Sequence, residues 1–330
     1  MELKIIAIAG ILLAGAGTAS LAGSPDAFLK HPLKRPLATL TVGLSFDQVN
    51  PYLAVYDRAF RAFTAELGVR AVILDSQGEV ARQPANIRDL VAQQVDVIIV
   101  MANNPKTAVP ALKEAHDAGI PVVLSNSQID ASADAYVSAW TGPDHYRIGL
   151  QAGESLAKAL GGKGNVAIIV GNPGGWASVE RERGTRDALA RYPAMKVVDS
   201  QPSDWKREKA QSVTEAFISR YGRQLDGIVA ADDGIALGAL NAVDAAVAAG
   251  NIGKDQVKIT SGNAFSAGYD AIAAGGSYYG SAIQAPEEDA RAALEAALKV
   301  VEGESVPPKT FFDTQPFTKD TVKGFKRPVI

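Results

Sequence analysis

Short apolar segments alternate with segments of helical period along most of this chain, and this alternation restricts the fold more than any other feature. From Thr39 onward, runs rich in β-branched residues precede stretches in which apolar residues recur every three or four positions. This pattern is typical of βαβ units, in which helices connect parallel strands. Strands are predicted at residues 40–44, 70–74, 96–101, 121–125, 135–139, 165–170, 196–200, 226–230, 256–260 and 278–283. Helices are predicted at 51–67, 84–94, 105–118, 176–192, 205–221, 234–249, 265–274 and 286–302.

The alternation of predicted strands and helices starts again after Gly142-Pro143, which indicates a duplicated architecture. A chain of 330 residues also exceeds the roughly 250–300 residues at which single cores stop growing. We therefore predict an α/β fold with two doubly wound parallel-sheet lobes joined by a three-strand hinge. The hinge is expected near 140–144, 262–265 or 284–286, and 311–315. The predicted N-terminal lobe spans 38–142 plus 285–313, and the C-terminal lobe spans 143–284 plus 314–330.

The first residues have the features of an export signal. Lys4 precedes an apolar run, and Ser20 and Ala22 are small residues at the positions that a signal peptidase reads. We expect residues 1–22 to be a cleaved signal peptide and 23–37 to be a tether, which places the mature chain in the periplasm. A retained membrane anchor is the alternative, because Ile5–Gly23 lacks charge.

Polar and aromatic side chains gather where the predicted strands end. In an open parallel sheet, ligands bind at the carboxyl ends of the strands, so these positions are candidates for contact with a small molecule. Amides, carboxylates and aromatic rings dominate the set, which comprises Phe46, Asn50, Tyr52, Asn103, Asn126, Trp176, Trp205, Asp232, Asp233, Asn263 and Gln284.

Several other chemistries lack support in the sequence. The three histidines, His31, His116 and His145, have no metal-ligand spacing and are interpreted as solvated or capping residues. The glycine-rich turn at 171–175 lacks the spacing of a dinucleotide site, and no histidine follows Ser266 to complete a hydrolase triad. No cofactor is expected. The net charge of −3, without a basic run, argues against nucleic acid as a partner. The chain has no cysteine, which excludes disulfides and thiolate catalysis.

Several motifs together resemble the ribose-binding type of type I periplasmic binding proteins, the solute receptors of sugar ABC transporters. The resemblance covers about residues 37–330 and predicts the type I periplasmic binding protein fold. It is carried by Asn50-Pro51-Tyr52-Leu53, by Asp75-Ser76-Gln77 with 85–90, by Arg181-Glu182-Arg183-Gly184, by 200–205, and by Asp232-Asp233 with 236–240.

The resemblance implies ligand contacts from Asn50, Tyr52, Arg181, Trp205, Asp232, Asn263 and Gln284. The strand-end positions Phe46 and Asn126 complete the predicted ligand-binding set. For Tyr52 and Trp205, packing in the core is the alternative. Asn126-Ser127 stands where many pentose and hexose receptors have Asp-Arg, and Asn263 stands where they have Asp, so ribose itself is not the expected ligand. Arg181 and Asp232 are expected to pair when the site is empty.

The predicted function is capture of a small sugar or polyol between the lobes and delivery to the permease of an ABC importer by a monomeric receptor. An exported co-receptor for chemotaxis or signalling stays open as an alternative. A regulatory domain of a repressor would begin with a helix-turn-helix, whereas this chain begins with an apolar leader. A carbohydrate-active enzyme could use only Asp232, Asp233 and Glu180 as acids.

Overall fold

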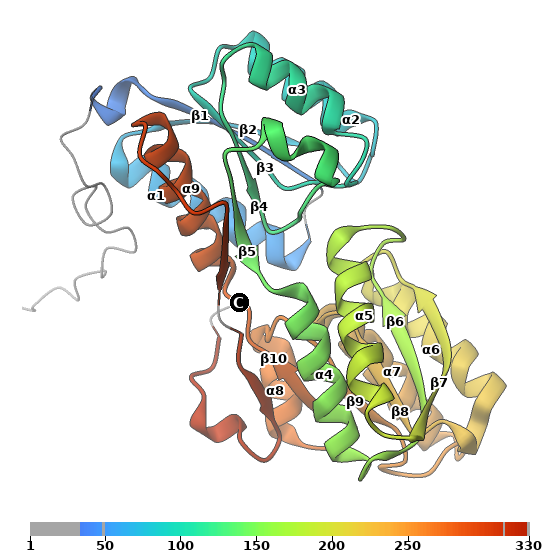
Figure 1. The fold of residues 1–330 in the computed structure, drawn as a ribbon. Helices are drawn as coiled ribbons and strands as arrows, with labels where there is room; N and C mark the ends of the chain where they lie inside the picture. Colours follow the sequence, from blue (N-terminus) through green and yellow to red (C-terminus); the bar gives the residue numbers. More distant parts are fainter. Residues whose placement is uncertain (1–33, 48–49, 313, 329–330) are drawn as a thin grey trace, which may run out of the picture.

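The computed structural model describes residues 34–47, 50–312 and 314–328, and they form two lobes that each contain a six-stranded sheet (Figure 1). The N-lobe sheet has the order β11-β5-β4-β3-β1-β2, and every neighbouring pair is parallel. Its strands are β1 (Thr41–Phe46), β2 (Arg70–Asp75), β3 (Val97–Val100), β4 (Val122–Ser125), β5 (Ala139–Pro143) and β11 (Lys309–Phe312). Its helices are α1 (Pro51–Leu67), α2 (Arg82–Ala92), α3 (Val109–Asp117) and α9 (Pro286–Val301).

The C-lobe sheet repeats this plan with the order β12-β10-β9-β8-β6-β7. Only its edge strand β12 runs antiparallel, against β10. The strands are β6 (Lys163–Val170), β7 (Ala194–Pro202), β8 (Gly227–Ala230), β9 (Lys258–Thr260), β10 (Tyr278–Ala282) and β12 (Pro316–Thr318). The helices are α4 (His145–Ala159), α5 (Trp176–Ala190), α6 (Arg207–Tyr221), α7 (Asp233–Ala248) and α8 (Ser266–Ala274). The predicted α/β fold with two doubly wound lobes is confirmed.

The first βα unit shows how local sequence positions a residue of the later site. Asn50 directly precedes α1, and its Oδ1 accepts a hydrogen bond of 2.9 Å from the Leu53 N–H, which caps the helix. Pro51 occupies the first turn, where its missing N–H costs nothing. Gly68 ends the helix with a φ of 70°, a conformation that glycine adopts without strain. Asn50 is therefore held at the carboxyl end of the sheet.

The structure differs from the prediction around the first crossing between the lobes. Residues 131–136 form a 3-10 helix, and β5 follows at Ala139–Pro143 instead of at 135–139. The helix α4, which directly follows β5, was missed. Its apolar stripe contains Gly149 and Gly153, which lower the helical signal of the sequence, and only packing against α5 explains them.

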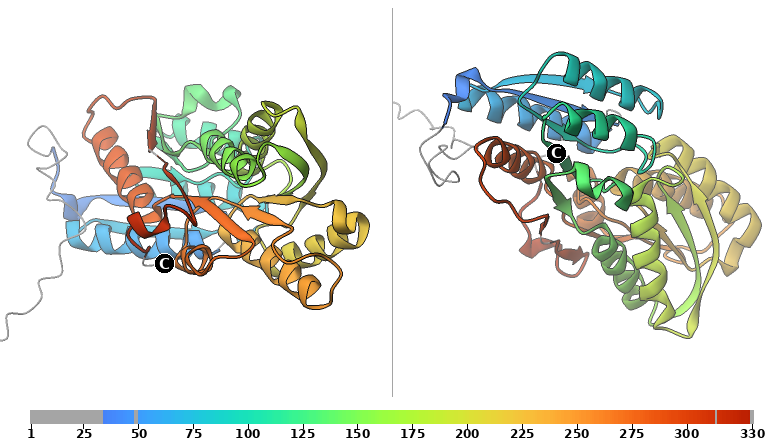
Figure 2. Two further views of the ribbon diagram at one scale, coloured as in Figure 1. Left: turned by 90° about the horizontal axis from the view of Figure 1, so that it is seen from below. Right: turned by 45° about the horizontal axis from the view of Figure 1, so that its top comes forward.

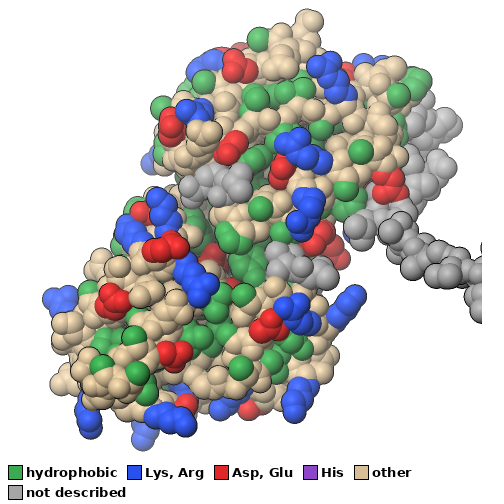
Figure 3. All heavy atoms as spheres, turned by 180° about the vertical axis from the view of Figure 1, so that it is seen from behind, with side chains coloured by type: hydrophobic (Ala, Val, Ile, Leu, Met, Phe, Trp, Pro, Cys, Tyr) green, Lys and Arg blue, Asp and Glu red, His purple; other side chains and the backbone are tan. Residues whose placement is uncertain are grey.

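The chain passes between the lobes three times, as the views in Figures 1 and 2 show. The crossings lie between β5 and α4, between β10 and α9, and between β11 and β12. Residues 262–265 instead connect β9 to α8 within the C-lobe. Seen from behind, the surface is hollowed between the lobes, with Lys and Arg side chains on both rims (Figure 3).

The predicted signal peptide and most of the predicted tether lie outside the described residues. Of the tether, Lys34 contacts the N-lobe, because its backbone N–H donates to Glu302 Oε2 at 2.6 Å. Leu37 is buried in the N-lobe core. Within residues 34–328, apart from the gaps at 48–49 and 313, no helix is long and apolar enough to span a bilayer.

Helices α4 and α5 approach each other at three glycines. A Cβ at Gly149 would collide with the backbone carbonyl of Arg181, and a Cβ at Gly153 would lie 2.7 Å from the Ala188 Cβ. A Cβ at Gly184 would collide with the Tyr146 carbonyl and lie 2.7 Å from the Leu150 nitrogen. This contact sets the distance between α4 and α5, which carry His145 and Arg181.

We predict that Gly184→Ala lowers the free energy of unfolding by about 3 kcal/mol, since the new methyl group must push two backbones apart. Urea denaturation of the purified chain measures this change. The matched control is Gly324→Ala, because no atom lies within 4 Å of a Cβ at that position, and we expect it to stay within about 0.5 kcal/mol of the wild type. Equal stabilities of the two variants would contradict the close packing of α4 on α5.

Candidate functional site

A cavity of about 70 Å³ lies between the lobes, and side chains from both line it. Eight of the nine predicted site residues are in its wall, and these are Asn50, Tyr52, Asn126, Arg181, Trp205, Asp232, Asn263 and Gln284. The ninth, Phe46, does not line it but is buried in the N-lobe core at the end of β1. The wall residues come from loops and helix starts at the carboxyl ends of parallel strands, where the sheet topology brings them together.

Arg181, in the second turn of α5, is 4% exposed and is the centre of the C-lobe wall. Its NH2 group donates to Asn263 Oδ1 at 2.9 Å and to Gln284 Oε1 at 2.7 Å. Its NH1 group donates to the Ala231 carbonyl at 2.6 Å. Because both amide oxygens face the guanidinium, the amide NH2 groups of Asn263 and Gln284 point away from it. Arg181 therefore orients two hydrogen-bond donors of the cavity wall.

The expected ion pair between Arg181 and Asp232 is not formed. Asp232 Oδ1 instead accepts a 2.8 Å hydrogen bond from the Ile235 N–H and caps α7. Burial raises the pKa of Asp232 to about 6, while this N–H and the nearby guanidinium oppose the shift. Burial also lowers the pKa of Arg181 to about 10, so the guanidinium is still charged at neutral pH. The cap holds the Asp232 carboxylate at the cavity wall.

His145, interpreted from the sequence as solvated or capping, is instead buried and lines the cavity. Its Nδ1 accepts a hydrogen bond from Arg181 Nε at 3.2 Å. Its Nε2 lies 3.1 Å from both the backbone oxygen and the Oδ1 of Asn126, so Nε2 carries the proton and donates. Burial and the charge of Arg181 lower the pKa of His145 well below its usual value, so the ring is neutral.

Asn126, Tyr52 and Asp289 continue this network into the N-lobe. Asn126 Nδ2 donates to Asp289 Oδ2 at 2.9 Å, and the Tyr52 hydroxyl donates to the same oxygen at 2.9 Å. Asp289, which lies in the first turn of α9, was not predicted. Burial raises its pKa to about 6 against the effect of these hydrogen bonds. Both polar ends of the Asn126 side chain are therefore committed to protein partners.

Trp205 forms an aromatic wall between Arg181 and the glycine-rich turn. Its Nε1–H donates to Asn172 Oδ1 at 2.8 Å, and the Arg181 guanidinium lies 5.7 Å from its ring centroid. A Cβ at Gly171 would collide with the indole, so glycine is required there for the ring to pack against the turn. Asn172 and Trp176 also line the cavity. Trp176 was a strand-end candidate but was left out of the predicted ligand-binding set, and Asn172 was in neither set.

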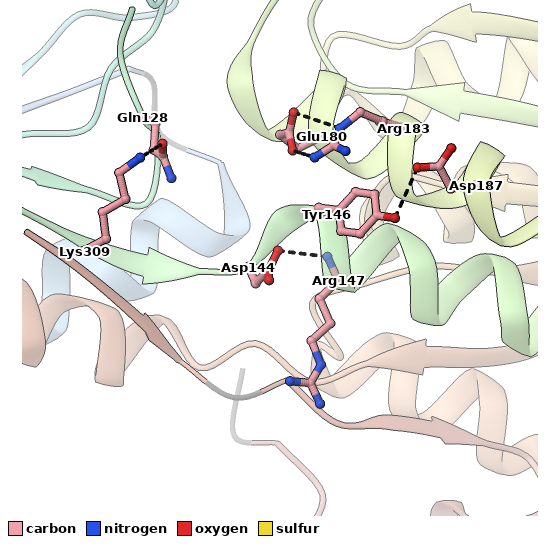
Figure 4. A network of polar contacts seen from close by, with 8 residues as sticks. All are labelled: Gln128, Asp144, Tyr146, Arg147, Glu180, Arg183, Asp187 and Lys309. Carbon is pink, nitrogen blue, oxygen red and sulfur yellow. Dashed lines mark hydrogen bonds and ion pairs between the residues drawn. The ribbon is translucent and has the colours of Figure 1, made fainter. Parts of the chain in front are cut away.

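Surface contacts link the first turn of α4 to the middle of α5 beside the crossing (Figure 4). The Tyr146 hydroxyl donates to Asp187 at 3.1 Å, and the Arg183 guanidinium lies 4.1 Å from the Tyr146 ring centroid. Asp144 caps α4 by accepting from the Arg147 N–H at 3.0 Å. These contacts fix His145 relative to Arg181.

Of the three acids that a carbohydrate-active enzyme could use, two lie outside the cavity. Asp233 is fully buried, accepts hydrogen bonds from Ser261, Ser281 and the Phe265 N–H, and does not line the cavity. Glu180 forms an ion pair with Arg183 at the surface. Of these acids, only Asp232 reaches the cavity, and its Oδ1 caps α7.

An interlobe cavity lined by amides, one guanidinium and two indoles, in a doubled α/β fold, defines a class of small-molecule receptors, and similar proteins belong to the same class. The chain matches the periplasmic binding protein domain family over residues 44–305 and belongs to it. This is a family of solute-binding proteins and not of enzymes, which confirms the predicted absence of an enzymatic role.

Three solute-binding proteins illustrate what this chain is similar to. The xylitol-binding protein of Mycolicibacterium smegmatis is 28% identical over 319 residues, which cover 97% of this chain and 86% of that protein. An ABC transporter solute-binding protein from Actinobacillus succinogenes, solved with bound D-allose, aligns with a TM-score of 0.78 and 27% identity over 87% of this chain and 100% of that chain. A galactofuranose-binding protein aligns with a TM-score of 0.80 and 26% identity over 86% of this chain and 96% of that chain.

We predict that His145 makes folding less favourable in acid. The unfolded chain binds a proton on this residue below about pH 6.5, whereas the folded protein keeps the ring neutral, so the free energy of unfolding falls as the pH falls. Between about pH 7.5 and 5.5, the wild type should lose about 1 kcal/mol more than His145→Gln. Urea titrations at both pH values measure this difference, and parallel losses in the two proteins would contradict it.

Proposed function

We propose that this chain is an exported receptor that captures a neutral sugar or polyol between its lobes and delivers it to an ABC importer. The observation that carries the proposal is the interlobe cavity in which Arg181 orients the amides of Asn263 and Gln284 beside the indole of Trp205. In this proposal, residues 1–22 act as a cleaved export signal, and the mature chain works in the periplasm as a monomer.

The chemistry of the cavity suits a hydroxyl-rich guest. Each hydroxyl can donate and accept, and it can therefore pair with amide donors and with the Asp232 carboxylate. The apolar C–H faces of a sugar or polyol can cover the Trp205 ring. Because an unpaired buried polar group costs about 1–3 kcal/mol, a ligand with a mismatched hydroxyl pattern binds more weakly. The cavity thus selects by the arrangement of hydroxyls.

Signalling to the importer would follow from lobe closure. Three short crossings join the lobes, and such segments absorb a hinge rotation while each sheet stays rigid. A ligand that touches both lobes favours the closed state by its difference in affinity for the two states. A micromolar receptor requires about −8 kcal/mol of net binding free energy. The permease would recognise the closed arrangement of the two lobe surfaces.

We expect Trp205→Ala to weaken binding of the best ligand among xylitol, D-ribose, D-allose and myo-inositol by roughly 10- to 100-fold, because the aromatic wall is lost. Trp205→Phe keeps a ring but loses the hydrogen bond to Asn172, so its loss should be smaller. Tryptophan fluorescence reports binding in the wild type, since Trp176 and Trp205 both line the cavity. Calorimetry compares the variants, and an unchanged affinity in Trp205→Ala would remove this residue from the site.

The balance of charge predicts discrimination against phosphorylated ligands. Arg181 already uses four of its five N–H groups on protein acceptors, and the carboxylates of Asp47 and Asp232 also line the cavity. A phosphate ester adds a charge of about −1.5 to −2 near these acids. Each sugar or polyol that binds should therefore bind at least ~100-fold more tightly than its phosphate ester. Competition calorimetry tests this, and equal affinities would refute the neutral-ligand proposal.

A further inference from the structure

Two polar atoms in the N-lobe wall of the cavity have no hydrogen-bond partner among the described residues. Among the described residues, five buried side-chain atoms lack a hydrogen bond, and these are Ser45 Oγ, Asp47 Oδ1, Asn103 Nδ2, Trp140 Nε1 and Thr141 Oγ1. Of their residues, only Asp47 and Asn103 line the cavity. One is an acceptor and the other is a donor. Leaving such groups unpaired costs about 1–3 kcal/mol each, so their position beside the cavity calls for an explanation.

The backbone around Asn103 is held firmly in place. Gln83, a buried residue of α2, donates from Nε2 to the Met101 carbonyl at 2.8 Å and accepts from the Asn103 N–H at 2.7 Å. This double contact fixes the loop that follows β3. The Asn103 side chain is 5% exposed, yet its Nδ2 has no protein acceptor. The loop therefore presents a donor to the cavity.

Asp47 directly follows β1 and is fixed by the neighbouring turn, because its carbonyl accepts from the Gly78 N–H at 2.9 Å. Within the part of the chain that the structure describes, its carboxylate has no basic partner, and burial together with the negative charge of Asp75 raises its pKa to about 6. The side chain of Asn126, by contrast, is committed to His145 and Asp289. The N-lobe wall therefore offers the free groups of Asp47 and Asn103 where Asn126 offers none.

We propose that Asp47 and Asn103 form a hydroxyl-binding subsite in the N-lobe wall, in which Asp47 Oδ1 accepts hydrogen bonds from hydroxyls of the sugar or polyol and Asn103 Nδ2 donates to them. A hydroxyl can satisfy both kinds of group, since it donates and accepts. The inference rests on the proposed function, because it assigns two further specificity-determining residues to the same cavity. Arg181, Asn263 and Gln284 line the opposite side of the cavity, so in this proposal the ligand forms hydrogen bonds with both lobes.

The subsite has a consequence for the pH dependence of binding. Hydroxyls that donate to a carboxylate favour its charged form, so the bound ligand lowers the pKa of Asp47 and the affinity falls as the pH falls through about 6. The ionisable groups around Asp47 are Asp75 at the end of β2 and, in the cavity wall, Arg181, His145 and Asp232. Asp232 also makes the affinity depend on pH. Asp47→Asn should therefore remove only part of the pH dependence of binding.

Calorimetry of the full mature chain with xylitol, D-ribose, D-allose and myo-inositol tests the proposal. Asp47→Asn and Asn103→Ala should each weaken the best of these ligands by about 10- to 100-fold at neutral pH. Their matched controls are Asp57→Asn and Asn104→Ala, because Asp57 pairs with Arg61 on α1 and Asn104 caps its own turn, both outside the cavity. The controls should bind within about twofold of the wild type.

A stability readout separates a binding role from a structural one. Asp47→Asn removes a buried carboxylate that has no partner, so the ligand-free variant should melt at or above the temperature of the wild type while it binds more weakly. Monodeoxy analogues of the best ligand give a second readout. The analogue that lacks the hydroxyl facing Asp47 should lose affinity for the wild type and lose less for Asp47→Asn.

The outcomes distinguish the two proposals. If the wild type binds a ligand and both Asp47→Asn and Asn103→Ala bind it equally well, the subsite is refuted while the receptor function stands. If Asp47→Asn melts below the wild type and no deoxy analogue shows coupling, Asp47 has a structural role and the subsite is again refuted. If the wild type binds none of the four compounds, the proposed function fails and the subsite fails with it.

Discussion

The buried guanidinium of Arg181 is the interaction on which the geometry of the cavity depends. A charge with so little exposure must be surrounded by hydrogen-bond acceptors, and here all of them are neutral groups from different parts of the chain. They come from the start of α4, the end of β8, the loop after β9 and the crossing that follows β10. The charge therefore fixes the tautomer of His145 and the orientation of two amides. Glycines make this possible, since only their lack of a side chain lets α4 approach the backbone of Arg181.

Several of the unfavourable local features of the described chain lie in the cavity wall. Asn126, Trp205 and Asn263 have φ values of 61°, 58° and 92°, which non-glycine residues rarely adopt. Asp47 and Asn103 contribute the unpaired atoms. Strain and unsatisfied groups persist only where surrounding structure enforces them, and they are common at ligand sites. The packed cores of the two lobes hold these residues in their strained conformations. The ligand-free protein is therefore less stable than it would be with a relaxed cavity wall.

The sequence predicted the alternation, the two lobes and eight residues of the cavity wall, because strand ends and helix caps leave local signals such as Asn50-Pro51. It did not predict α4, and with it the role of His145 was missed. The glycines of α4 weaken the helical pattern, and their purpose is visible only when α5 is packed against them. Asp289 was missed for a similar reason, since its partners lie more than 160 residues away in the sequence. Phe46 followed the strand-end rule but faces the core.

The position of each wall residue relative to the hinge suggests how a ligand enters. His145 and Gln284 lie within the crossings or next to them, so a rotation about the hinge moves them little, and the contacts among Arg181, His145 and Asn126 can persist as the lobes separate. Asn50, Trp205 and Asp232 also line a second, larger pocket of about 520 Å³ together with Lys206 and Phe265. If the lobes rotate about these crossings as proposed, the half of the cavity beside the hinge would stay assembled, while the half lined by Asn50, Trp205 and Asp232 would open to admit the ligand. Closure would then bring only the aromatic wall into place, because the rest of the site is already formed. Fewer side chains would lose conformational entropy when the ligand binds.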